Sequence, residues 1–70
     1  MKSAQPWRST DEALRASDVA LARAAQYEAS AAKMAVDGNI AMAESMQRVA
    51  AAYRACALTY KAQAELLHEA

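Results

Sequence analysis

The sequence has one glycine, one proline, one cysteine and no phenylalanine in 70 residues. A single cysteine, Cys56, excludes an internal disulfide and favours a reducing, cytoplasmic setting. No apolar run approaches the roughly 18 residues that a membrane span needs. Residues 1–12 also lack the apolar stretch of a secretory signal. We therefore expect a cytoplasmic protein without a membrane partner.

An excess of charge of either sign is also absent. Eight basic and eight acidic residues give a formal net charge of zero. A protein that binds a phosphate backbone needs a concentrated positive surface, so nucleic acid is not an expected partner. There is no glycine-rich phosphate loop and no Ser-His-Asp set. Cys56 and His68 are more than three helical turns apart, too far to act as nucleophile and base. We expect no enzymatic activity and no cofactor.

One spacing resembles a metal site. Glu65 and His68 form a Glu-x-x-His pair, which places two metal ligands on one face of a helix. Such a site also needs glutamates at the same depth and a second motif from another helix. Glu12 is the nearest candidate, at the solvated end of the expected structure. We therefore predict no metal site, and expect His68 to interact with the dipole of its helix.

Alanine, by contrast, is abundant, at 21 of the 70 positions. Large apolar side chains are correspondingly few, although hydrophobic residues make up 56% of the chain. A chain of this length buries only about 60% of its unfolded surface and is marginally stable alone. The composition therefore favours a thin core and self-association.

Two long segments without glycine or proline predict an all-α protein. Ser9 and Glu12 fit a capping box at the start of a helix over residues 10–37. Gly38 suits the left-handed position after a helix, and Asn39 can cap a second helix over residues 40–69. Equal arms around a short connection favour an antiparallel hairpin over a continuous rod kinked at Gly38. The expected organisation is a single helical domain over residues 9–70. It follows an N-terminal arm, residues 1–8, that is either flexible or docked through Trp7.

Heptad spacing predicts the surface that packs. The expected seam comprises the large residues Tyr27, Met34, Met42, Met46, Val49, Tyr53, Cys56, Tyr60 and Leu67, with an alanine row at positions 43, 50, 57 and 64 beside it. A chain that folds back at Gly38 pairs Tyr53 with Ala24 and Tyr60 with Ser17, so large side chains meet small ones. We expect Cys56 to be a small buried hydrophobic residue in this seam.

Apolar residues outside the seam favour more than two helices. Val19, Leu58 and Leu66 fall on the backs of the hairpin, and regular apolar surface of this kind needs a covering layer. A second copy supplies it most simply, which predicts a homodimeric, alanine-rich four-helix bundle. We expect a non-catalytic interaction protein: a small adaptor, an inhibitor, or a regulatory or assembly factor that acts by protein–protein contact.

The candidate contact residues are Trp7, Arg23, Arg54, Leu58 and Leu66. Reversal of the chain at Gly38 places Arg23 and Arg54 at the same height along the hairpin, with no carboxylate between them. This unneutralised pair favours an acidic partner. A first alternative is a bundle that captures an anionic small molecule, such as a nucleotide, between protomers near Tyr53 and these arginines. A second is RNA binding by one face, because the expected outline resembles the ROP-type hairpins that dimerise into RNA-binding four-helix bundles. That resemblance is one of architecture and does not by itself transfer function.

Overall fold

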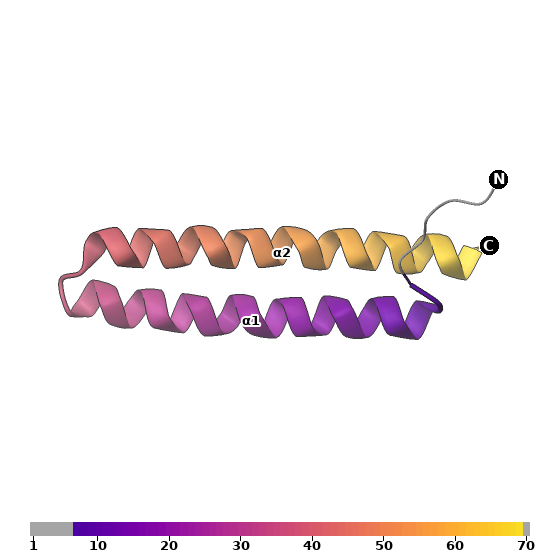
Figure 1. Cartoon of the computed structure of the whole chain (residues 1–70), viewed down its shortest axis with the longest axis horizontal. Helices are drawn as coiled ribbons and strands as arrows, with labels where there is room; N and C mark the ends of the chain where they lie inside the picture. The colour runs from indigo at the N-terminus through magenta and orange to yellow at the C-terminus, as the bar shows by residue number, and fades with distance from the viewer. Residues whose placement is uncertain (1–6, 70) are drawn as a thin grey trace.

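The computed structural model describes residues 7–69 and contains two helices, α1 (Thr10–Val36) and α2 (Ile40–Glu69). They lie side by side and antiparallel, with the turn at one end and both chain termini at the other (Figure 1). The hairpin measures 52 × 20 × 13 Å, so it is a single layer of helices. The predicted all-α hairpin is confirmed, and the kinked rod is excluded. The first helix ends one residue earlier than predicted.

The start of α1 is capped as the sequence predicts. The Glu12 backbone N–H donates to the Ser9 hydroxyl at 3.2 Å. The Glu12 carboxylate in turn accepts the backbone N–H of Arg8 at 2.9 Å, one residue before the cap. The first bond satisfies an amide that the first helical turn leaves unpaired, and the second gives a partner to the amide just before the cap. They also fix the direction in which the chain enters α1. The arm was predicted over residues 1–8, and residues 1–6 of it lie outside the described residues.

The turn at Gly38 has the left-handed geometry that the sequence predicts. Its φ is +86°. The Gly38 N–H donates to the Ala35 carbonyl at 3.0 Å, and the Asn39 N–H donates to the Met34 carbonyl at 2.8 Å. This pair of bonds is a Schellman motif, which ends a helix by satisfying its last carbonyls. The Asn39 side-chain oxygen then accepts the Met42 N–H at 3.4 Å, so Asn39 caps α2 as predicted.

The contact between the helices is built from small residues. The buried positions are Ala13, Ser17, Ala20, Ala24 and Ala31 on α1, and Ala43, Ala50, Ala57 and Ala64 on α2. No large side chain in the described chain is fully buried. The Ser17 hydroxyl donates to the Ala57 carbonyl at 3.1 Å, which ties the two backbones together at a buried point. Because alanine has almost no side chain, the two helices can approach closely along this line.

The predicted seam is therefore wrong in one respect. The alanine row that was placed beside the seam is its centre, and Tyr53, Tyr60, Met46 and Leu67 flank it half-buried. Met42, Val49 and Cys56 are exposed in the hairpin. The prediction that Cys56 is buried is wrong for the hairpin alone, because its side chain lies one residue before Ala57 and turns about 100° away from the contact line.

Candidate interaction surfaces

The hairpin presents two different sides, separated by the alanine row of α2. Side chains three residues after each buried alanine lie on one side of this row, and side chains four residues after lie on the other, because the helix has 3.6 residues per turn. The first set includes Tyr53 and Tyr60, and the second includes Arg54 and Lys61. We call these sides the aromatic face and the charged face.

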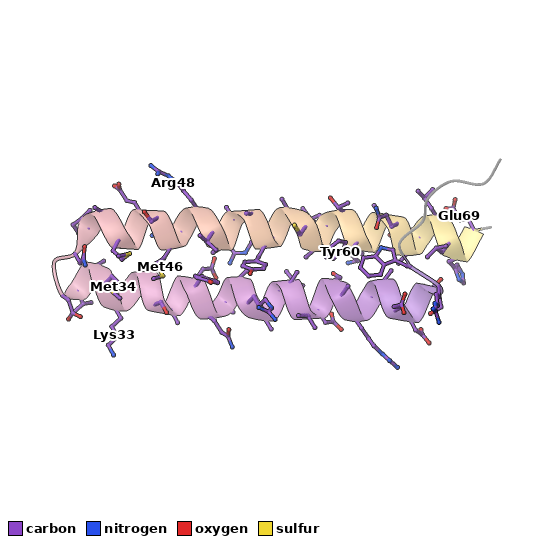
Figure 2. All side chains as sticks on the ribbon, in the orientation of Figure 1. Lys33, Met34, Met46, Arg48, Tyr60 and Glu69 are labelled. Atoms are coloured by element: carbon purple, nitrogen blue, oxygen red, sulfur yellow. The ribbon has the colours of Figure 1, made fainter. Side chains whose placement is uncertain are left out.

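The aromatic face carries Trp7, Tyr27, Tyr53 and Tyr60, with Met34 and Met46 toward the turn. Figure 2 shows Met34, Met46 and Tyr60 in the groove between the two helices. The rings of Tyr27 and Tyr53 stack across the helices, with centroids 5.6 Å apart and planes at 19°. All six side chains are half-buried, so each keeps part of its apolar surface in solvent. Tyr53 was predicted to meet Ala24, and its observed stacking partner is Tyr27.

Trp7 docks the segment before α1 onto this face. Its indole N–H donates to the side-chain oxygen of Gln63, and its ring meets Tyr60 edge-on with centroids 5.0 Å apart. Trp7 itself is therefore docked on the hairpin. Gln63 was not predicted as a site residue, because a glutamine in a heptad row gives no sign that an indole will reach it.

A surface depression of about 310 Å³ lies beside Trp7 on the aromatic face. Trp7, Tyr53 and Tyr60 form its aromatic walls, and Arg23 contributes a guanidinium. Its remaining lining residues are small or aliphatic: Ala16, Val19 and Ala20. Within residues 7–69, the structure gives Arg23 no ion pair with a carboxylate. The depression could therefore receive a flat apolar group with a negative charge at one edge.

The charged face contains the ion pair between Arg54 and Glu28. The two side chains are 54% and 37% exposed, and a pair this open to solvent contributes only about 0 to 1 kcal/mol to folding. This pair corrects the prediction that Arg23 and Arg54 share a level without a carboxylate. Arg54 points to Glu28, whereas Arg23 lines the aromatic face. The two arginines therefore do not form one anion site.

A second depression lies at the open end, on the charged side, lined by residues that include Thr10, Leu14, Lys61, Glu65 and His68. It brings the Glu-x-x-His pair near the start of α1. In the described part of the chain, no group of three or more histidine, cysteine or acidic residues is placed to hold a metal ion.

The leucines predicted as partner contacts remain open to solvent. Leu58 is 70% exposed and Leu66 is 60% exposed, and Val19 on α1 is 52% exposed. Leu58 lies one residue after Ala57 and so turns toward the charged side, opposite to Cys56. Neither helix, over the described residues, has a segment long and apolar enough to cross a membrane.

Comparisons of the chain with protein-family models, with curated proteins and with solved structures gave no match.

Proposed function

We propose that this chain is a non-catalytic interaction protein that works as a homo-oligomer, a dimer in its simplest form. It acts as a small adaptor, an inhibitor, or a regulatory or assembly factor through protein–protein contact, in the cytoplasm. The observation that carries the proposal is the composition of the core: the hairpin fully buries only alanine and serine.

The energetics of such a core favour association. Ordering a residue costs roughly 1 to 2 kcal/mol of backbone entropy, and the burial of large apolar side chains normally offsets it. Here four leucines and Met42 are 40% to 70% exposed, and the tyrosines are only half-buried. A second layer of helices would remove that surface from water, which supports the four-helix bundle. Because the chain carries no net charge, two copies do not repel each other at long range.

The dependence of thermal stability on protein concentration tests the proposal. Association with folding makes the melting temperature rise with concentration, by mass action. We expect the midpoint of the circular dichroism transition at 222 nm to increase over a hundredfold range of concentration. A midpoint that stays constant over that range would show that the hairpin folds alone.

Contact with a different protein is the second part of the proposal, and Leu58 and Leu66 are its candidate residues. A tagged chain should recover its partner from the native host, and the double variant L58E/L66E should not. Recovery of the same protein by both forms would exclude these leucines as the contact.

A ligand-capturing role is a second candidate function, favoured by the depression beside Trp7. Its aromatic walls and the unpaired Arg23 suit an aromatic anion such as a nucleoside monophosphate. Quenching of Trp7 fluorescence by adenosine monophosphate, lost in Arg23→Gln and kept in Arg54→Gln, would support this role. Equal quenching in both variants would contradict it.

No observation favours the RNA-binding alternative, because the arginines and lysines of residues 7–69 are spread over several sides of the hairpin.

A further inference from the structure

We propose that the aromatic face is the self-association surface, and that it is covered by a second copy of the chain turned end for end. This inference rests on the proposed function, and it adds which face is used and in which direction the copies lie. The area of the face, its low charge and the placement of charges along the edges of the hairpin all suit a second copy as the occupant.

The area of the face suits a dimer. A face 52 Å long and 20 Å wide covers about 1,000 Å², so two stacked copies would bury about 2,000 Å², at the upper end of the range for stable specific interfaces. The surface is also long and straight, so a second hairpin of the same length matches it over its whole extent. A second copy would place apolar neighbours against the part of each half-buried aromatic and methionine side chain that remains in solvent.

The two faces differ in charge. Over residues 49–63 of α2, the charged residues are Arg54 and Lys61, and both lie on the charged face. The aromatic side of the same segment carries Val49, Cys56 and Gln63, which have no formal charge. On the facing part of α1, Arg23 is the charge that borders the aromatic depression. Its long stem allows the guanidinium to reach the solvated edge of an interface. Removing the aromatic face from water therefore costs less desolvation free energy than removing the charged face.

The outer edges of the hairpin set the direction. Glu12 and Lys33 are three heptads apart, so they lie on one edge of α1 at its opposite ends. Arg48 and Glu69 have the same spacing and lie at opposite ends of one edge of α2. Figure 2 shows Lys33 and Arg48 pointing outward near the turn and Glu69 at the open end. Copies with their turns together would place basic edges beside basic edges. Copies turned end for end place Lys33 of one copy at the level of Glu12 of the other.

Paired charge substitutions on the two faces test which face is used. Val49 is 38% exposed and Leu58 is 70% exposed, so either position accepts glutamate in a folded hairpin. Val49→Glu should raise the dimer dissociation constant about 100-fold or more, because each copy would bury an unpaired carboxylate. Leu58→Glu should change it less than about threefold. Sedimentation equilibrium gives both constants. Circular dichroism, recorded at a concentration that saturates the weaker dimer, checks that each variant still folds into helices when it is assembled.

The outcomes separate this inference from the proposed function. A wild-type chain that stays monomeric contradicts both. A wild-type dimer that Leu58→Glu dissociates and Val49→Glu does not shows self-association through the other face, which overturns the inference alone. Met42→Glu, another exposed position on the aromatic side, should behave like Val49→Glu, and failure to do so would also count against this face.

The direction of the copies has its own measurement. Val36 lies at the turn end and is 87% exposed, so a spin label at V36C in a Cys56→Ser background should not disturb packing. With copies turned end for end, the two labels lie about 40 Å or more apart, since residue 36 is about 13 residues from the middle of α1 at 1.5 Å per residue. Turns at the same end would bring the labels within about 30 Å. A short distance in a pulsed dipolar experiment would overturn the proposed direction.

Discussion

The ring of Tyr27 on α1 stacks on the ring of Tyr53 on α2, with centroids 5.6 Å apart and planes at 19°. It is a direct side-chain contact between the helices near the middle of the hairpin, on the flank of the alanine core. Stacked aromatic pairs contribute about 0.5 to 1.5 kcal/mol beyond their burial. The pair therefore helps to hold the register while leaving apolar surface for a second layer.

A double-mutant cycle measures this contact. Replacement of Tyr27 and Tyr53 by leucine, singly and together, should give a coupling of about 0.5 to 1.5 kcal/mol in the free energy of unfolding. The same cycle on Tyr27 and Tyr60, which do not stack, is the matched control and should give a coupling near zero. Equal couplings in the two cycles would show that the stack itself contributes nothing.

The corner at Gly38 gives a second prediction. A Cβ at this position would meet no atom within 4 Å, so the cost of Gly38→Ala comes from the backbone alone, at φ +86°. We expect about 1 kcal/mol of destabilisation in urea unfolding. Gly38→Asn should cost less, because asparagine tolerates the left-handed region better than alanine. A stabilising effect of alanine would mean that the corner does not persist in solution.

The alanine core gives a third prediction. Ala50 is 1% exposed, so Ala50→Leu forces the two helices apart and should cost about 1 to 3 kcal/mol. Ala51 is the adjacent, exposed position, and Ala51→Leu should change the free energy of unfolding by less than about 0.5 kcal/mol. If both leucines are tolerated equally, the helices do not pack along the alanine row.

Docking of Trp7 gives a fourth prediction. Trp7 is the single tryptophan of the chain, so its fluorescence reports this contact alone. Gln63→Leu removes the acceptor of the indole N–H and should leave that donor unpaired in a half-buried site, at a cost of about 1 kcal/mol. The emission maximum should move toward longer wavelength as the indole becomes more solvated. Gln47→Leu, on the charged face, should leave the emission unchanged.

Local features of the sequence predicted the fold well. The capping residues Ser9 and Asn39 act on amides three residues away, and the need for glycine at residue 38 follows from backbone sterics. The hairpin itself followed from two arms of equal length. These features depend on short stretches of chain, so they can be derived without knowing what packs against them.

The details of the interface were less predictable. Heptad spacing favours the large apolar residues as the centre of a seam, yet the helices approach along the row where both offer alanine, which moves the tyrosines to the flank. The partner of Arg54 was missed for a different reason. The prediction paired residues whose backbones lie at the same height along the hairpin. The long side chain of Arg54 instead reaches along the groove to Glu28, whose backbone lies at a different height. The surfaces that bind partners could not be derived from one chain, because the sequence marks exposed apolar residues and does not identify what covers them.

Sedimentation equilibrium of the unmodified chain measures its self-association without any substitution. Because the hairpin fully buries no large side chain, we predict a dimer mass that falls toward the monomer mass of 7.5 kDa only on dilution, with helical structure lost in parallel. A mass of 7.5 kDa at every concentration, with full helical content, would show that the alanine core is sufficient and would contradict the account.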